Sequence, residues 1–295
     1  MKIIVPATSA NLGPGFDALG LSLKLYNEIE ITPQSFTCIS IKGEGSKKNS
    51  IKKNNSFVNI FNEIYLSLVG KTDDFKFSFT NNIPFSRGLG SSSSVVIGAI
   101  AAAYEMAGFK VDRNTILNKA VFYENHPDNI APATFGGFTS SIIENSKVYT
   151  QKANLSDDIK AVVVIPDKAM STNDSRNKLP KHYSMKDTVS NLAHAAFLTS
   201  CFIKQDYDSL RIASKDMMHE NLRMQSLPEL FDVRNIAYKN GALMSTLSGS
   251  GSTFLNIAYK KDAPNLQKQL AENFKDFRVE ILDFDNDGFK IISKS

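Results

Sequence analysis

A short segment rich in glycine and serine, from Pro84 to Ser94, has the composition of an anion-binding loop. It reads PFSRGLGSSSS and lies between a strand pattern at 75–79 and a small-residue helix pattern at 95–107. Glycine lets a backbone turn tightly with its N–H groups exposed, and the N-terminus of the following helix attracts negative charge. No Gly-Lys-Ser/Thr ends the segment, as in a Walker A loop, and Ser93 stands where a dinucleotide fingerprint has its third glycine. The segment therefore predicts a site for nucleotide phosphates, with a glycine turn and a serine helix cap as the alternative.

A second polar cluster follows the helix pattern at 114–123. Two carboxylates, an imidazole and two amides fall within the six residues from Glu124 to Asn129, and prolines at 127 and 132 stiffen the segment. Carboxylate oxygens are ligands for hard cations, and a carboxylate or an imidazole can take a proton from a hydroxyl group. The cluster predicts metal coordination or hydrogen bonding to a hydroxylated substrate, with a polar Asx-type turn as the alternative.

Segments near the two ends of the chain could also approach a ligand. VPATSANLGPGFD at 5–17 alternates short polar groups with glycine and proline, and LSGSGST at 247–253 is a turn between strand patterns. Loops of this kind bind small polar ligands or merely connect strands. DFDNDG at 283–288 matches the first half of an EF-hand loop, but Lys294 stands where the bidentate glutamate belongs, which predicts a turn instead of a calcium site.

The elements that would position these segments are a mixture of helices and strands. Period-two alternation and short apolar runs predict strands at 23–32, 36–41, 75–79, 135–143, 161–165, 242–247, 253–259, 278–284 and 289–293. Apolar residues at helical spacing predict helices at 56–68, 95–107, 114–123, 187–204, 206–224 and 265–274. Alternation of the antiparallel type favours an α+β fold over a doubly wound parallel sheet. We expect two domains, at 1–155 and 156–295.

The composition excludes several classes of protein. The chain has 295 residues, of which 42% are hydrophobic and 22% charged, so it can bury a core. The net charge is +4, and the lysine-rich segment 42–56 alone carries five lysines and one glutamate, so the rest is neutral. This argues against a nucleic-acid-binding face and predicts a solvated loop at 42–56.

The rare residue types give further limits. Cys38 and Cys201 cannot form a disulfide framework, and the four histidines are too scattered for a Cys/His zinc site. The longest apolar run next to a helix pattern is half of what a membrane span needs, and no signal-peptide pattern opens the chain. We expect a soluble cytoplasmic protein with no membrane partner.

Four ordered motifs resemble a known family. The chain has ATSANLGPGFDALG near its start, GLGSSS at 88–93, HPDNIAP at 126–132 and LSGSGST at 247–253. These residues resemble the GHMP small-molecule kinases, and within them the homoserine kinases, over effectively the whole chain. The resemblance implies an α+β protein with a ribosomal S5 domain 2-like N-terminal domain and a ferredoxin-like C-terminal domain. It also implies ATP and Mg²⁺ as cofactors, L-homoserine as the substrate in threonine biosynthesis, and often a homodimer.

The resemblance further implies roles for individual residues. The nucleotide would bind Asn59, Pro84, Ser86, Arg87, Gly88, Leu89, Gly90, Ser91, Ser92, Ser93 and Ser94. The substrate would bind Asn11, Asp17, His126, Asp128, Asn129, Thr172, Arg176, Arg223 and Gly249. Ser92 and Glu124 would hold Mg²⁺, and together with Asp128 and Asn129 they would form the catalytic set.

The charges of these residues suit an amino acid. Asp17 would pair with the substrate ammonium group, and the planar forks of Arg176 and Arg223 would pair with its carboxylate. Asp128 is the candidate for orienting the hydroxyl group, although the γ-phosphate could itself take the proton. In the alternative interpretation, Arg223 forms a surface pair with Glu220, and His219 is a solvated helix residue.

The sequence also departs from the family pattern and leaves rivals open. Ser93 and Ser94 replace the usual alanines, and Ser252 stands where proline is common. Another GHMP activity, such as a mevalonate-type or sugar kinase, would have no use for paired arginine and aspartate recognition. A regulatory nucleotide-binding protein would not need Ser92 and Glu124, and a nucleic-acid-binding protein would need a basic face.

Overall fold

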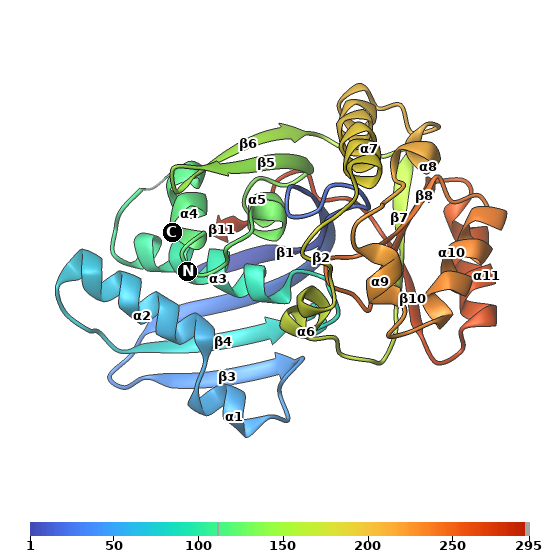
Figure 1. Ribbon diagram of the computed structural model, residues 1–295. Helices are drawn as coiled ribbons and strands as arrows, with labels where there is room; N and C mark the ends of the chain where they lie inside the picture. Colours follow the sequence, from blue (N-terminus) through green and yellow to red (C-terminus); the bar gives the residue numbers. More distant parts are fainter. Residues whose placement is uncertain (111, 293–295) are drawn as a thin grey trace.

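The structure, a computed structural model, describes residues 1–110 and 112–292. The chain folds into two lobes, and its first and last described strands both lie in the first lobe (Figure 1). The first lobe contains β1 (Lys2–Ala10), β2 (Leu19–Pro33), β3 (Cys38–Gly43), α1 (Asn49–Lys53), α2 (Ser56–Val69), β4 (Phe75–Asn81), α3 (Ser91–Met106), α4 (Arg113–Ala120), α5 (Pro127–Phe135), β5 (Phe138–Glu144), β6 (Lys147–Ala153) and β11 (Lys290–Ile292). The second lobe contains β7 (Ile159–Ile165), α6 (Thr172–Asn177), α7 (Met185–Lys204), α8 (Leu210–Ala213), α9 (Glu220–Met224), α10 (Glu229–Lys239), β8 (Met244–Leu247), β9 (Phe254–Tyr259), α11 (Ala263–Asn273) and β10 (Arg278–Leu282).

The sheet of the first lobe has the strand order β11-β1-β2-β4-β3, and β5 pairs with the start of β2 and with β6. Among the described strands of this sheet, only β3 and β4 pair in parallel. Phe75, Phe77 and Phe79 alternate along β4 and are buried under α2, where their rings contact Phe57 and Phe61 edge to face. This core therefore follows from the period-two and helical patterns in the sequence.

The sheet of the second lobe is antiparallel, with the strand order β10-β7-β9-β8. Helices intervene between β7 and β8 and between β9 and β10, which is the ferredoxin-like arrangement. Alternate residues of β7 enter different cores. Val162 and Val164 pack under α10 and α11, whereas Val163 and Ile165 belong to a cluster that the two lobes share.

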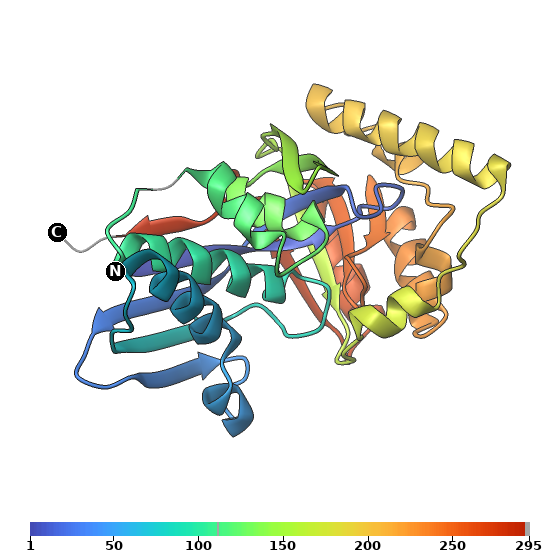
Figure 2. The ribbon, with the colours of Figure 1, turned by 60° about the vertical axis from the view of Figure 1, so that its left-hand side comes forward.

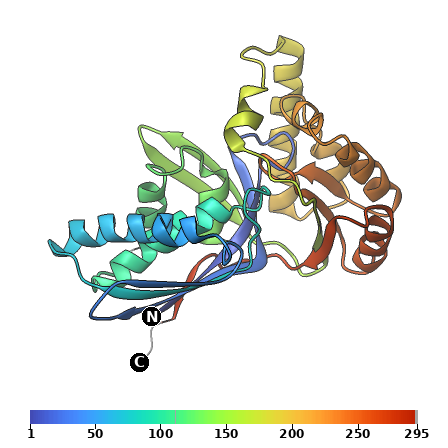
Figure 3. The ribbon, with the colours of Figure 1, turned by 90° about the horizontal axis from the view of Figure 1, so that it is seen from below.

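The shared cluster joins the lobes and so fixes the place where they meet. It contains Leu19 and Leu21 from β2 together with Leu198 and Phe202 from α7. Figure 2 shows α7 along the outside of the second lobe, and Figure 3 shows β1 and β2 running between the two lobes. Residues on facing edges of the lobes can therefore form one site.

The predicted elements are largely confirmed, but the helix at 206–224 is wrong. Two short helices, α8 and α9, stand there, separated by a turn. The carboxylate of Asp216 explains the break, because Oδ2 accepts hydrogen bonds of 2.8 Å from the backbone N–H groups of His219 and Glu220. An aspartate that binds the N–H groups two to four residues ahead ends one helix and begins another.

Two loop interpretations also need correction. The polar cluster at 124–132 is only partly a loop, because α5 begins at Pro127, a residue type favoured at the first position of a helix. The lysine-rich segment 42–56 contains the short helix α1, none of whose residues is buried. The predicted domain boundary near residue 155 stays a prediction, and β11, from the end of the chain, pairs with β1.

Within the described ranges, 1–110 and 112–292, no helix combines the length and the apolar character that crossing a membrane requires.

Candidate active site

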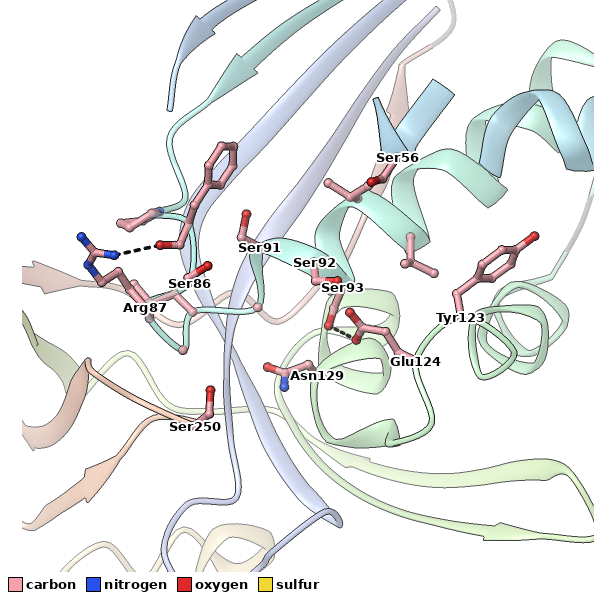
Figure 4. Close-up of a pocket in the computed structure, with 18 of the residues that line it drawn as sticks. Ser56, Ser86, Arg87, Ser91, Ser92, Ser93, Tyr123, Glu124, Asn129 and Ser250 are labelled. Carbon is pink, nitrogen blue, oxygen red and sulfur yellow. Dashed lines mark hydrogen bonds between the residues drawn. The ribbon is translucent and has the colours of Figure 1, made fainter. Parts of the chain in front are cut away.

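The loop between β4 and α3 has the geometry that an anion-binding loop requires. Ser86, Gly88 and Gly90 have positive φ angles of 55°, 79° and 68°. Gly90 occupies the N-cap position of α3, and in the described part of the chain no side chain caps this helix. The alternative interpretation of the serines as a helix cap is therefore wrong. Ser91, Ser92 and Ser93 lie together at the helix start (Figure 4). The first N–H groups of α3 thus remain available to phosphate oxygens at the positive end of the helix.

Both glycines are required because the loop approaches other backbone and side-chain atoms closely. A Cβ atom on Gly88 would lie 2.1 Å from the carbonyl oxygen of Ser248. One on Gly90 would lie 1.9 Å from Oγ1 of Thr8. Thr8 belongs to the first lobe and Ser248 to the second, so the loop is in contact with both lobes.

Hydrogen bonds fasten this loop to the second lobe. The Ser248 hydroxyl donates to the carbonyl oxygen of Gly88 at 2.6 Å, and the N–H of Thr253 donates to that of Arg87 at 3.0 Å. The Arg87 guanidinium group donates to the carbonyl oxygen of Pro166 and pairs with Asp167 at 2.7 Å. Its charge is therefore already used to tie the loop to the second lobe.

The loop borders a cleft of about 1160 Å³ at the junction of the lobes. Most of the residues that the resemblance implies line it: Asn11, Asp17, Pro84, Ser86, Arg87, Gly88, Leu89, Gly90, Ser91, Ser92, Ser93, Glu124, His126, Asp128, Asn129, Arg176, Arg223 and Gly249. They come from both lobes and from widely separated parts of the chain, so the fold brings them together.

Two predicted nucleotide-binding residues lie outside the cleft. Asn59 is exposed on α2, and its amide donates to the side chain of Asn54 at 2.8 Å. Ser94 is buried, and its hydroxyl donates to the carbonyl oxygen of Ser91 and accepts from Asn27. Its role is thus to hold the helix start in place.

Other residues near these two line the cleft instead. Helix α2 presents Ser56, Phe57 and Ile60 to it, and Tyr123 lines it from the turn after α4. The helical spacing of Phe57 and Ile60 was visible in the sequence, but it indicated a face buried in the core and not the wall of a ligand-binding cleft. The side chain of Thr172, a predicted substrate residue, lies outside the described part of the structure.

Glu124 lies beside the serines at the start of α3. The Ser93 hydroxyl donates to Oε2 of Glu124 (Figure 4). Burial raises the pKa of this carboxyl group, whereas hydrogen bonds from Ser92 and Ser93 oppose the rise. A cation bound beside the partly buried Glu124 carboxylate would neutralise its negative charge.

Asp128 is a buried carboxyl group of the cleft, with 6% of its surface exposed. Its burial, and then the negative charges of Asp17 and Glu124, raise its pKa to about 7. The neighbouring Asn129 accepts a 2.7 Å hydrogen bond from the Thr8 hydroxyl, which fixes its amide at the cleft wall. A carboxyl group with this pKa can accept and release a proton near neutral pH.

Asp17 and Arg176 form an ion pair across the cleft. Both terminal nitrogens of Arg176 donate to Asp17, at 2.7 Å and 3.0 Å. The Nδ1 atom of His126 lies 3.4 Å from the same carboxylate, and burial lowers the pKa of this histidine. The backbone N–H of Asp17 donates to Oδ1 of Asn11, which fixes the turn that carries the carboxylate.

Arg223 is buried, with 2% of its surface exposed, so the surface pair with Glu220 is wrong. Glu220 pairs with Arg234 at 2.7 Å instead. One terminal nitrogen of Arg223 donates to the carbonyl oxygen of Gly249 at 3.0 Å, and Asn11 donates to the same oxygen. The Nε atom of Arg223 is buried and makes no hydrogen bond within the described residues.

His219, expected to be solvated, is also buried and supports Arg223. Its Nε2 atom lies 2.8 Å from the carbonyl oxygen of Gly13, which can only accept, so Nε2 carries the hydrogen. Nδ1 is then an acceptor for Arg223, at 3.3 Å. Sequence reasoning missed this residue because its partners are about 200 positions away, and only its spacing of four from Arg223 was visible.

Comparisons with known proteins agree with this geometry. The family described as GHMP kinases N terminal domain matches residues 55–137, and GHMP kinases C terminal matches residues 198–276. Proteins named homoserine kinase from Campylobacter concisus and from Campylobacter fetus are each 66% identical, over 99% and 98% of this chain and 99% of their own. The crystal structure of homoserine kinase from Cytophaga hutchinsonii has the same fold, with a TM-score of 0.87, 23% identity and coverage of 99% of this chain and 97% of that one. The chain therefore belongs to the GHMP kinases and, among these small-molecule kinases, to the family of the homoserine kinases.

Proposed function

We propose that this chain transfers the γ-phosphoryl group of ATP to the side-chain hydroxyl of L-homoserine, giving ADP and O-phospho-L-homoserine. The observation that carries the proposal is Arg223, a buried guanidinium group at the cleft whose Nε donor has no partner within the described residues. A buried donor without a partner costs about 1–3 kcal/mol. A substrate carboxylate would satisfy it.

The other charges of the cleft fit the ammonium group of the same substrate. Asp17 lies within hydrogen-bonding distance of Arg176, so the acidic and basic groups of the cleft stand side by side. An amino acid brings one group of each sign and can pair with both. Mevalonate and sugars lack the ammonium group with which Asp17 could form an ion pair.

The nucleotide would lie along the loop from Pro84 to Ser93. The open N–H groups at the start of α3 suit the phosphates. The apolar wall made by Phe57 and Ile60 suits the base. The transition state of phosphoryl transfer is loose, so catalysis depends mainly on positioning the reactants and neutralising their charge. A loop with open N–H groups would supply both.

Magnesium would bind at Glu124 and Ser92. The donor set fits, because Glu124 is a partly buried carboxylate beside two hydroxyl groups. No group of three or more His, Cys, Asp or Glu side chains that could hold a metal occurs among the described residues. Mg²⁺ takes most of its ligands from phosphates and water, so one carboxylate and one hydroxyl group are enough protein ligands for it. When bound, the ion would neutralise negative charge on the phosphate oxygens.

Asp128 would orient the homoserine hydroxyl and accept its proton. It lines the cleft beside Asn129, and its raised pKa makes it a stronger base than an ordinary aspartate. Asn129 cannot take a proton and would only donate or accept a hydrogen bond. Direct transfer of the proton to the γ-phosphate is the alternative.

The test is ADP release from ATP and Mg²⁺ with L-homoserine, compared with L-serine, L-threonine, mevalonate and galactose. We expect turnover with L-homoserine to exceed the others. Arg223→Lys should raise the KM for L-homoserine about 10- to 100-fold and leave the KM for ATP unchanged, because lysine lacks the bidentate fork. Arg278→Lys, at an exposed pair on β10, is the matched control. Preferred turnover of a substrate without an amino-acid head would refute the proposal.

Four further parts of the proposal rest on the family and the sequence. A role in threonine biosynthesis would place the chain after the reaction that makes homoserine. A homodimer, a cytoplasmic location and a boundary between two domains near residue 155 stay predictions. Sedimentation of the purified chain would decide the first of these, and limited proteolysis with cleavage near residue 155 would support the last.

A further inference from the structure

Phe16 lies close to both arginines that would bind the substrate carboxylate. It belongs to the loop between β1 and β2 and is partly exposed. The Cζ atoms of Arg176 and Arg223 are each 5.1 Å from the centre of its ring. The ring of His219, which supports Arg223, is also 5.1 Å away.

Two guanidinium groups so close together need a reason to stay there before an anion arrives. The positive charge of Arg176 disfavours the charged form of Arg223, whose pKa is lowered first by burial. Asp17 neutralises Arg176 with two hydrogen bonds. Arg223, by contrast, donates to the neutral Gly249 carbonyl and to His219, and no salt bridge joins it to an acid among the described residues.

An aromatic ring can attract the Arg223 guanidinium group in place of an acidic partner. The face of a phenyl ring is negative, and a guanidinium group within about 6 Å of its centre is attracted to it. Phe16 therefore offers one neutral partner to both cations. It does so without the carboxylate that would compete with the substrate for Arg223.

Ordinary packing does not explain this ring. Phe16 belongs to none of the three hydrophobic clusters that the described residues form. Its neighbour Asp17 is held by the hydrogen bond to Asn11, and Gly13 of the same loop is held by His219. The loop is thus fixed on both sides of the ring, and the ring projects among the charged groups.

We infer that Phe16 is a positioning residue that holds the Arg176 and Arg223 guanidinium groups in place as a clamp for the substrate carboxylate. The inference rests on the proposed function, since it assigns a role in binding the amino-acid head of L-homoserine. Phe16 would not touch the reacting atoms. It would act on substrate affinity and on the preference for substrates that carry a carboxylate.

The experiment compares Phe16→Leu, which keeps apolar bulk and loses the ring, with Phe16→Tyr, which keeps the ring. We expect Phe16→Leu to raise the KM for L-homoserine about 5- to 30-fold, as expected for the loss of cation–π contacts. The value of kcat and the KM for ATP should change less than about twofold. Phe16→Tyr should stay close to the unmodified enzyme. Phe36→Leu, at a phenylalanine with 64% of its surface exposed, is the control.

A second measurement separates the clamp from a general loosening of the loop. 3-Amino-1-propanol is L-homoserine without its carboxylate, and its inhibition constant should be the same in Phe16→Leu and in the unmodified enzyme. Phe16→Leu should also be tested in a chain that already carries Arg176→Gln. In that background it should raise the KM for L-homoserine less than about threefold.

The outcomes distinguish this inference from the function on which it rests. L-homoserine turnover that is insensitive to Phe16→Leu would overturn the inference alone. An equal loss of affinity for L-homoserine and for 3-amino-1-propanol would also overturn it, because the ring would then serve only the loop. No turnover of L-homoserine by the unmodified enzyme would overturn the proposed function and the inference together.

Discussion

At the scale of single residues, the position of Asp128 determines its chemistry. The carboxyl group is buried beside two other acids, Asp17 and Glu124, so removing its proton places a charge where solvent cannot reach it. The resulting pKa of about 7 matches the requirement for a base that works near neutral pH. The same burial that makes Asp128 reactive must also cost folding stability.

The first prediction concerns activity. Asp128→Asn removes the proton acceptor but keeps the size and polarity of the side chain. If Asp128 accepts the proton of the substrate, kcat should fall by at least about tenfold, which corresponds to about 1.4 kcal/mol. In the unmodified enzyme kcat/KM for L-homoserine should rise with pH through about 7 and then level off. If kcat falls less than tenfold and the pH profile does not change, Asp128 is not the proton acceptor. The γ-phosphate would then take the proton directly.

The second prediction concerns the stability of the same variant. Between the ordinary aspartate pKa of 3.8 and the folded value of about 7, the folded chain retains a proton that the unfolded chain has lost. Stability therefore falls as the pH rises through this window, by at most about 1.4 kcal/mol per pKa unit. Asparagine does not ionise, so Asp128→Asn should gain stability relative to the unmodified enzyme at pH 8 but not at pH 3.5. Urea denaturation at both pH values would measure this, and a gain of equal size at both would contradict it.

Single residues also show the limits of sequence reasoning. Arg176 and Arg223 line the cleft together, as the resemblance implied. His219 and Phe16 were missed as supports for them, because each makes its decisive contacts with residues distant in the chain. Spacing along one helix cannot reveal a partner in another lobe.

At the scale of elements, the loop before α3 depends on glycines in left-handed conformations. Gly88 and Gly70 form a natural comparison, with φ angles of 79° and 77°. A Cβ atom on Gly88 would meet the Ser248 carbonyl oxygen, whereas nothing lies within 4 Å of one on Gly70. The two positions thus share the conformational strain and differ in the close contact.

The third prediction uses this pair. Gly70→Ala should cost about 1–2 kcal/mol of folding stability, the usual cost of a left-handed alanine, and leave catalysis unchanged. Gly88→Ala carries the same strain and must also move the loop, so we expect the KM for ATP to rise at least about tenfold. Denaturation curves and ATP titrations of both variants would measure these effects. Equal ATP affinities in the two variants would show that the close contact does not matter.

Most elements follow from local patterns, and the exceptions have local causes. Two local patterns were sufficient to predict β4 and α2. These are the alternation of Phe75, Phe77 and Phe79 and the helical spacing of apolar residues in α2, and each marks a face that is buried in one core. The helix expected at 206–224 failed because the Asp216 side chain binds backbone N–H groups. Apolar residues keep their helical spacing across this break, so the spacing alone cannot predict where one helix ends and the next begins.

At the scale of the whole molecule, the cleft exists because the lobes share a core. Phe138 of β5 and Phe202 of α7 stack with their ring centres 4.4 Å apart across the junction. Both side chains are fully buried in the shared cluster. We infer that the lobes hold each other in place and unfold as one unit.

The fourth prediction tests this coupling. Phe202→Ala should reduce the free energy of unfolding by about 3–5 kcal/mol, as is usual for large-to-small changes in a core. Unfolding should remain a single transition by circular dichroism and by fluorescence. Phe197→Ala changes an exposed phenylalanine of the same helix and should cost far less. Two separate transitions, with only one shifted by Phe202→Ala, would contradict the coupling.

The arrangement of the lobes was beyond local reasoning. The alternation patterns indicated strands and an α+β fold, but they contain no information on strand order. Nor did they indicate that β11 returns to pair with β1. The resemblance to the GHMP kinases implied the overall architecture correctly, because it carries the pairing of distant segments that no window of sequence contains.

The most direct test of the proposed function is the identity of the product. The purified chain would be incubated with ATP, Mg²⁺ and L-homoserine, and the products followed by phosphorus NMR and mass spectrometry. We expect ADP and a phosphate monoester on the side-chain hydroxyl of homoserine in equal amounts. ADP accompanied only by inorganic phosphate, or no ADP at all, would contradict the assignment of this cleft to phosphoryl transfer onto L-homoserine.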